Sequence, residues 1–270
     1  MTSPRLRFGV LSYVNCLPAT LALELGEVAA KQLSLRRGTP AQLNEAVRTG
    51  ELDVSVVSAA EYLQNPELYH RLEDIALWCD GPVRSVCLYS KFDRDRLSAS
   101  PVHLLVTPES ATSVALARML TCQATTAPFS TLEQAESAVR EGRTDAVLLI
   151  GDTALAPPGW TDKLQTHDLG AWWKDVTGHP MTYAVWVARR DLPEDKLEQA
   201  RDILAESCSW GERELKRVVE EAHRRSGLPT QELERYFKGI QFRVTAESKA
   251  GYQEFREKFL TPNLLCGGLQ

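Results

Sequence analysis

Short apolar runs alternate with amphipathic stretches through most of the 270-residue chain. Runs rich in β-branched residues predict strands, and apolar residues spaced three and four apart predict helices. The first part of the chain predicts strand, helix, strand, helix and strand at 7–11, 16–25, 32–37, 40–48 and 53–57. Such alternation is typical of a mostly parallel sheet with helical crossovers.

A second series of the same kind follows in the middle of the chain. Strands are predicted at 103–107, 124–129 and 146–150, and helices at 113–120 and 131–141. A short helix is predicted to open at 58–62, further strands are predicted at 83–90 and 182–188, and 194–258 is predicted to be mostly helical.

One segment of the first series recurs in the second. Residues 43–58 and 135–150 both carry Ala-Val-Arg-x-Gly-x-x-Asp at the end of a predicted helix, followed by a buried strand. This similarity predicts an α/β protein of two lobes built on one plan, with a cleft between them where strand ends and helix starts meet. We expect 1–88 and 180–270 to form a discontinuous lobe I, and 89–179 to form lobe II.

Composition and charge narrow the class of protein. Hydrophobic residues make up 43% and charged residues 25%, which is typical of globular domains. No apolar run reaches the roughly 18–20 residues that a membrane helix needs, and a net charge of −5 gives no support to a nucleic-acid partner. The start has no apolar core of a secretion signal, so a cytoplasmic location is expected. The pattern predicts no oligomeric state.

The sequence offers no familiar metal or cofactor motif. The six cysteines form no C-x-x-C pair and fit neither a zinc site nor a disulfide framework, so we expect free, mostly buried thiols at Cys16, Cys79, Cys87, Cys122, Cys208 and Cys266. H-E-x-x-H, G-x-S-x-G, Walker and G-x-G-x-x-G motifs are also absent. Neither a metal nor an organic cofactor is expected.

Small hydroxyl and amide residues gather at four predicted strand-to-helix junctions, at 12–15, 58–61, 109–113 and 150–152. Free N–H groups at such helix starts bind anions without needing Lys or Arg. The same residue types also serve as ordinary N-caps. Their recurrence in two similar lobes favours ligand binding.

Several individual residues, at these junctions and at the crossings between the lobes, keep two interpretations open. Asn15 is either an N-cap or a ligand-binding amide, and Ser85 is either a cleft residue on a crossing strand or an ordinary half-buried serine. Glu61 and Asp152 are candidates for a general base, but both also suit capping or surface roles. His179 is either near the cleft or a turn residue.

Several of these segments together resemble the MqnA family, the chorismate dehydratases of the futalosine route to menaquinone. The segment Phe8-Gly-Val-Leu-Ser-Tyr-Val-Asn-Cys-Leu-Pro18 is similar to the opening "VSYLNxxP" signature of that family. The likeness continues through 50–62, 81–88, 110–116, 149–152, 168–178 and 236–242. It implies a type II periplasmic-binding-protein fold used as an enzyme.

The resemblance also implies a reaction and a set of site residues. Loss of water from chorismate gives 3-[(1-carboxyvinyl)oxy]benzoate, and the formation of an aromatic ring drives it, so the enzyme mainly positions the substrate and stabilises charge. We expect Asn15 to be catalytic, and the substrate to be bound by Ser12, Tyr13, Ser58, Ser85, Thr112, Ser113 and Gly151. The proton acceptor stays open between a substrate carboxylate, Glu61 and Asp152.

Three alternatives compete with this interpretation. A solute-binding protein for a small carboxylate would share the fold but would need export, and the effector domain of a transcription regulator would need a helix-turn-helix module. The sister lyase, 1,4-dihydroxy-6-naphthoate synthase, typically carries His in an Ile-His-Glu segment. Here the segment is Ile150-Gly151-Asp152, which favours the dehydratase.

Overall fold

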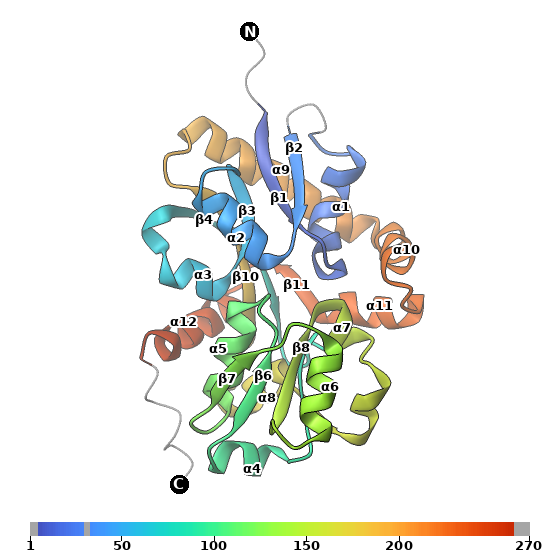
Figure 1. Cartoon of the computed structure of the whole chain (residues 1–270). Coiled ribbons are helices and arrows are strands. Elements are labelled where there is room, and N and C mark those ends of the chain that lie inside the picture. The colour runs from blue at the N-terminus through green and yellow to red at the C-terminus, as the bar shows by residue number, and fades with distance from the viewer. Residues whose placement is uncertain (1–4, 30–32, 262–270) are drawn as a thin grey trace. The chain divides into compact units, whose positions relative to one another are not determined.

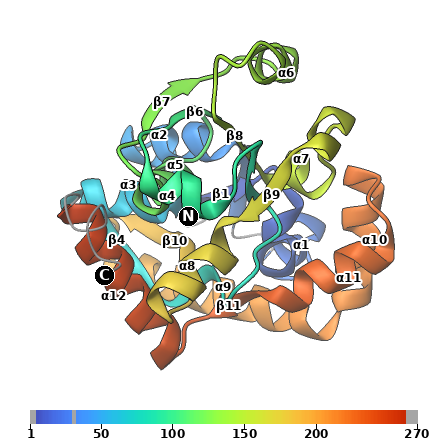
Figure 2. The same ribbon diagram turned by 90° about the horizontal axis from the view of Figure 1, so that it is seen from below.

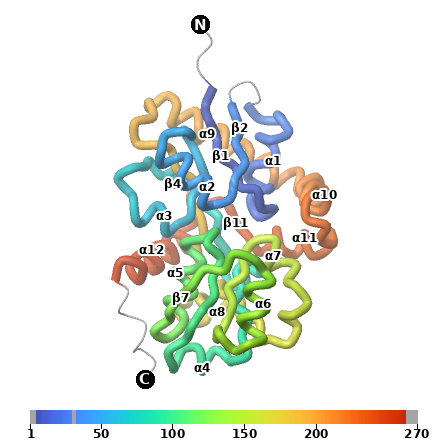
Figure 3. The backbone as a smooth tube through the Cα atoms, viewed as in Figure 1, coloured from blue at the N-terminus to red at the C-terminus, as the bar shows by residue number. Residues whose placement is uncertain are grey.

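The computed structural model describes residues 5–29 and 33–261 (Figure 1). The chain forms two compact units. Unit 1 comprises Met1–Trp78 and Tyr183–Val244, and unit 2 comprises Cys79–Thr182 and Thr245–Gln270. The chain passes from one unit to the other after Trp78, Thr182 and Val244, as can be followed along the tube in Figure 3.

Unit 1 is built on a six-stranded sheet with the order β11-β4-β10-β3-β1-β2. Strand β1 pairs in parallel with both β2 and β3, whereas β10 pairs antiparallel with β3. The strands are β1 (Leu6–Leu11), β2 (Leu33–Gly38), β3 (Val54–Ser58), β4 (Tyr69–Cys79), β10 (Met181–Arg189) and β11 (Ile240–Arg243).

Helices cover both faces of this sheet, with α2 and α9 on opposite sides (Figures 1 and 2). The short helical turn η1 (Val14–Cys16) leads directly into α1 (Leu17–Leu25). The other helical elements of unit 1 are α2 (Pro40–Arg48), α3 (Ala59–Gln64), η2 (Pro66–Leu68), α9 (Glu194–Arg213), α10 (Leu215–Ser226) and α11 (Thr230–Gly239).

Unit 2 is built on a five-stranded sheet with the order β7-β6-β8-β5-β9. Strand β6 pairs in parallel with β7 and β8, whereas β5 is antiparallel to β8 and β9. The strands are β5 (Val86–Ser90), β6 (His103–Val106), β7 (Thr125–Pro128), β8 (Ala146–Ile150) and β9 (Gln165–Asp168). The helical elements are α4 (Arg94–Ala99), α5 (Ala111–Leu120), α6 (Leu132–Arg140), α7 (Gly151–Leu155), η3 (Gly159–Lys163), α8 (Leu169–Thr177) and α12 (Ala246–Leu260).

The two sheets repeat one arrangement. The order β2-β1-β3-β10 in unit 1 corresponds to β7-β6-β8-β5 in unit 2, with the last strand antiparallel in each. The expected common plan is therefore confirmed. Both sheets are mixed and not mostly parallel as expected, because β5 and β10, the strands that connect the two units, run against their parallel neighbours.

The repeated helix has the same start and end in both units. Thr39 caps α2 by accepting the Gln42 N–H, and Thr131 caps α6 by accepting the Gln134 N–H. Each helix is followed by a glycine at positive φ, 75° at Gly50 and 70° at Gly142. L-residues with a side chain rarely adopt this left-handed conformation, which explains the glycine of the shared motif.

The repeated aspartate ties each central strand to its neighbour. The Asp53 N–H donates to the Arg7 carbonyl (2.8 Å), and the Asp53 carboxylate accepts the Arg7 main-chain N–H (2.9 Å). Asp145 makes the same pair of bonds with His103, at 2.9 and 2.7 Å. Such reciprocal bonds satisfy main-chain groups where the parallel strands begin.

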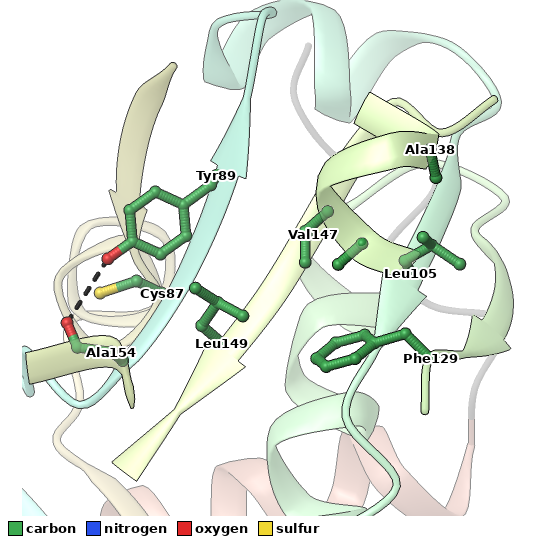
Figure 4. Packing of buried hydrophobic residues seen from close by; sticks show 9 residues of the cluster. Cys87, Tyr89, Leu105, Phe129, Ala138, Val147, Leu149 and Ala154 are labelled. Carbon is green, nitrogen blue, oxygen red and sulfur yellow. Dashed lines mark hydrogen bonds between the residues drawn. The ribbon is translucent and has the colours of Figure 1, made fainter. Parts of the chain in front are cut away.

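The core of unit 2 lies between its sheet and the helices around it (Figure 4). Strand β5 contributes Cys87 and Tyr89, and the Tyr89 hydroxyl donates to the Ala154 carbonyl at 3.4 Å. Helix α6 contributes mainly the small residues Ala135 and Ala138 to this cluster. The helix therefore packs close to the strands.

The last helix belongs to unit 2, whereas we expected 180–270 to lie in lobe I. Gly251 of α12 lies so close to the Pro180 carbonyl oxygen that a Cβ there would overlap it. The ring of Phe255 also meets Trp173 edge-on, with centroids 6.1 Å apart. Residues 79–88 likewise fall in unit 2 and not with the first segment, because β5 pairs with β8 and β9.

Strand β4, the longest strand among the described residues, was not predicted. Its first half mixes buried and exposed positions, with the charged residues Arg71, Glu73 and Asp74 between Tyr69 and the buried second half. Most predicted helices and strands otherwise lie within two residues of the observed ones.

No helix among the described residues is long and apolar enough to cross a membrane. Free thiols are found at five cysteines: Cys16, Cys79, Cys87, Cys122 and Cys208. Burial raises the pKa of the Cys208 thiol to about 12, so it stays protonated. Cys266 lies outside the described residues.

Candidate functional site

The Asn15 turn, residues 13–17, connects β1 to α1 in unit 1. Tyr13 precedes the helical turn η1, which holds Asn15, and Pro18 lies in the first turn of α1, where its missing N–H is not needed. The side-chain oxygen Oδ1 of Asn15 is buried and has no hydrogen-bond partner within the protein. An unsatisfied buried acceptor costs about 1–3 kcal/mol, so this oxygen is poised for a donor from a ligand.

Two other predicted residues of unit 1 lie near strand ends. Ser12 is exposed, and its N–H donates to the Gly38 carbonyl at 3.0 Å, extending the pairing of β1 with β2. Ser58 is buried at the end of β3, and its hydroxyl accepts the Glu61 N–H at 3.2 Å. Ser58 is thus the N-cap of α3.

Glu61 is buried among partners that hold its carboxylate. The Tyr69 hydroxyl donates to it at 3.0 Å, the Asn65 amide donates at 3.1 Å, and the Arg48 guanidinium lies 3.6 Å away. Burial and the negative charge of Glu61 raise the pKa of Tyr69, which keeps this phenol a hydrogen-bond donor. The arrangement is that of a structural ion pair and not of a free general base.

In unit 2, Ser85 and Gly151 are directly joined. The Gly151 N–H donates to the Ser85 carbonyl at 2.8 Å, and the Ser85 side chain is buried. The amide of Gly151 is therefore engaged within the protein. Gly151 has a φ of 58°, a conformation that favours glycine at this strand-to-helix junction.

Thr112 and Ser113 lie in the first turn of α5. Thr112 is fully buried and Ser113 is 2% exposed. Ser110 caps the helix: its hydroxyl accepts the Ser113 N–H at 3.2 Å and donates to the Ser113 hydroxyl at 2.9 Å. The Ser113 amide is thus used by the cap, while the first turn keeps its hydroxyl groups together.

Each unit gathers its candidate residues at one edge of its own sheet. In unit 1, Asn15 follows β1 and Ser58 ends β3, and these two strands are parallel neighbours. In unit 2, Thr112 follows β6 and Gly151 follows β8, which are again parallel neighbours. This is the carboxyl edge, where open α/β sheets bind ligands.

Asp168 holds three main-chain N–H groups, a role that was not predicted for it. Its carboxylate accepts the N–H groups of Val83 (3.1 Å), Arg84 (2.6 Å) and Ala171 (3.0 Å). It therefore caps α8 and fixes the turn before Ser85, where Arg84 has a φ of 63°. The sequence signals were an Asp before a helical stretch and its place at the start of the family-like segment 168–178.

Two histidines of unit 2 have defined contacts within the protein. The ring of His167 lies 2.8 Å from the Phe92 carbonyl, and burial lowers its pKa. His179 is half-buried, with its N–H bonded to the Thr177 hydroxyl at 3.2 Å. Within the described ranges, no three His, Cys, Asp or Glu residues are grouped so that they could hold a metal ion.

Comparison with solved structures identifies the fold. Protein AF1704 from Archaeoglobus fulgidus aligns with a TM-score of 0.80 at 19% identity, covering 98% of this chain and 100% of that one. The periplasmic aliphatic sulphonate binding protein SsuA from Escherichia coli aligns with a TM-score of 0.65 at 16% identity, covering 98% and 94%. The expected periplasmic-binding-protein-like fold is confirmed.

Comparison with known sequences identifies the family. The chain is 30% identical to a chorismate dehydratase of Thermus thermophilus, over 94% of this chain and 95% of that protein. Residues 6–260 match the model of a family described as menaquinone biosynthesis. With nearly its whole described length matched, the chain belongs to the menaquinone biosynthesis family.

Proposed function

We propose that this protein is a chorismate dehydratase, a carbon–oxygen lyase that removes water from chorismate in the futalosine route to menaquinone. The family match over 6–260 and the Thermus thermophilus relative support this activity. The structural observation that carries it is the unpaired Oδ1 of Asn15 at the carboxyl end of β1. A hydroxyl group of the substrate can donate the hydrogen bond that this oxygen lacks.

In the proposed reaction, the C3 proton of chorismate is removed and the C4 hydroxyl leaves as water. The product is 3-[(1-carboxyvinyl)oxy]benzoate, whose aromatic ring supplies the driving force. The amide of Asn15 is not basic, so its role is to hold the leaving hydroxyl or the enolpyruvyl group in place. Positioning of this kind lowers the barrier without a strong acid or base.

The proton acceptor is proposed to be a carboxylate of the substrate. Glu61 is less suitable, because its oxygens are occupied by Tyr69, Asn65 and Arg48. Asp152 lies in the first turn of α7, where it suits the helix dipole. A substrate carboxylate needs no group from the protein and lies within the same molecule as the proton.

The remaining contacts to chorismate are proposed to come from small hydroxyl groups. The amide of Gly151 is already bonded to the Ser85 carbonyl, so it does not bind the substrate. The proposed contribution of Gly151 is the space that its missing side chain leaves. The other proposed substrate-binding residues are Ser12, Tyr13, Ser58, Ser85, Thr112 and Ser113. We also propose a cytoplasmic location, supported by the free thiols of the buried cysteines.

One alternative has an observation in its favour: the fold is shared with SsuA, so the protein would bind a small anion without turning it over. Incubation with chorismate, followed by absorbance and mass spectrometry, separates the two functions. A dehydratase forms a new aromatic product that is lighter than chorismate by one water. Saturable binding with unchanged chorismate would establish the alternative.

The matched test of the catalytic residue compares two asparagines of unit 1. Asn44 also has a buried, unpaired Oδ1, but it lies within α2 and not at a strand end. We expect Asn15→Ala to lower kcat by about 10²-fold or more, as the removal of a group that stabilises charge in the transition state does. Asn44→Ala should keep the wild-type kcat. Equal kcat for Asn15→Ala and wild type would remove Asn15 from the mechanism.

A further inference from the structure

The position of Asn15 is set by its backbone. Its Oδ1 accepts no hydrogen bond within the protein, so the protein does not hold this oxygen through a bond of its own. The main chain after Asn15 must therefore fix where the side chain lies. Three carbonyl groups of that segment, on Cys16, Pro18 and Ala19, have contacts beyond the usual helical bonds.

Two of these contacts come from α9, which packs along α1 although nearly 190 residues separate the contacting groups (Figures 1 and 2). The Ser207 hydroxyl donates to the Ala19 carbonyl at 2.6 Å, and both residues are fully buried. One turn further along α9, Gly211 lies so close to Pro18 that a Cβ would overlap the Pro18 carbonyl oxygen. The third contact is local, from the Thr20 hydroxyl to the Cys16 carbonyl at 2.9 Å.

Both α9 residues are poor choices for a helix interior by themselves. Glycine weakens the middle of a helix, and a fully buried serine needs a partner for its hydroxyl. Contacts with α1 explain both residues. Gly211 lets the two helices approach closely, and the hydrogen bond from Ser207 fixes how far one helix is shifted along the other. Together they determine where the first turn of α1, and hence the Asn15 turn, stands.

We propose that Ser207 and Gly211 are positioning residues for Asn15. This inference rests on the proposed function only in taking Asn15 as the catalytic residue. In this role both residues act through α1, by holding the carbonyl groups that follow Asn15. Loss of the Ser207 hydroxyl, or addition of a methyl group at Gly211, displaces the turn.

The first test observes Asn15 without any substrate. The side-chain amide signal of Asn15 in a ¹H–¹⁵N NMR spectrum is identified by its loss in Asn15→Ala. We expect Ser207→Ala to shift this signal, and Ser98→Ala to leave it in place. Ser98 is a matched control because its hydroxyl also donates to a main-chain carbonyl, that of Arg94 at 2.8 Å, but on exposed α4. An unmoved Asn15 signal in Ser207→Ala overturns the proposal.

The second test is kinetic and uses chorismate as the substrate. Since a displacement of catalytic groups by ~1 Å can cost up to 10²-fold, we expect Ser207→Ala to lower kcat by about 10-fold while KM changes less than about twofold. Gly211→Ala should act in the same direction, with Gly159→Ala, which has open space around it, as its control. If Gly211→Ala does not fold, Ser207→Ala decides alone.

The two tests separate this inference from the proposed function. A wild-type protein that leaves chorismate unchanged contradicts the dehydratase activity, but the NMR comparison still decides whether α9 positions Asn15. A folded Ser207→Ala protein with wild-type kcat and KM, in an active enzyme, contradicts the positioning role.

Discussion

The two copies of the β-α-β segment, β2-α2-β3 and β7-α6-β8, share their main-chain bonds and differ in their side chains. The capping threonines, the left-handed glycines and the bonds of Asp53 and Asp145 are the same in both. The helix faces differ: α2 buries Leu43 and Val47, whereas α6 buries only two alanines.

The strand ends differ as well. Strand β3 ends in the capping residue Ser58, whereas β8 ends in Ile150, which makes no side-chain cap, followed by Gly151 at positive φ. The comparison teaches that the parts needed for building the sheet are kept, and that the strand ends are where the two units were free to acquire different roles.

The largest expected effect concerns the different helix faces. Leu43→Ala installs the residue that the second copy has at this place, Ala135, in a fully buried position. Because truncation of a fully buried leucine leaves a cavity, we expect a loss of about 3 kcal/mol in the free energy of unfolding, measured by urea denaturation. Leu132→Ala, at a partly buried position of α6, should cost about 1 kcal/mol. Equal costs would mean that the two helices pack alike.

The second expected effect concerns the aspartates. Besides the shared main-chain bonds, Asp53 accepts from the Arg7 guanidinium at 3.0 and 2.5 Å, where unit 2 has His103 in place of Arg7. Burial alone would raise the pKa of Asp53, but the hydrogen bonds and charge of Arg7 lower it below its usual range. At pH 7, Asp53→Asn should cost about 2 kcal/mol and Asp145→Asn about 1 kcal/mol, since Arg7 is partly exposed.

This difference has a defined pH dependence. The folded state lowers the pKa of Asp53, so its contribution is fully present above the unfolded value of about 4 and is lost as the pH falls through the folded value. The stability advantage of wild type over Asp53→Asn, from thermal melts, should therefore shrink below pH 4. An advantage that stays constant down to pH 2 would contradict the charged pairing.

The smallest expected effect concerns the shared glycines. Gly50→Ala and Gly142→Ala both force a side chain into the left-handed region, so each should cost about 1 kcal/mol. A Cβ at Gly50 would lie 3.5 Å from the Arg189 guanidinium, and one at Gly142 would meet nothing within 4 Å. Neither position would have a steric overlap, so the two variants should lose the same amount in melting temperature. A clear inequality would show that the two turns are not equivalent.

Local patterns predicted much of this fold because the repeated segment carries its own signals. Thr39, Gly50 and Asp53 each have a local or strand-pairing reason that is visible along the chain, and the observed α2 has the predicted bounds. The similarity to a menaquinone family and the two-unit α/β plan also followed from such motifs.

Features that depend on distant contacts were not predictable in this way. The place of α12 in unit 2 depends on Gly251 meeting Pro180, and the role of Asp168 depends on N–H groups more than 80 residues away. At the candidate site, the sequence indicated which junctions matter but not that the Gly151 amide would be occupied by Ser85. Alternation alone also did not reveal β4, because charged residues interrupt its first half.

The division of both units along the chain has a consequence for biosynthesis. Unit 1 is completed only when Val244 has been made, and unit 2 only when α12, which ends at Leu260, has followed. Neither core can therefore close until these late segments have left the ribosome, although most residues of both units are made earlier. Nascent chains arrested before α12 should expose the apolar surface around Trp173 and be substrates for chaperones.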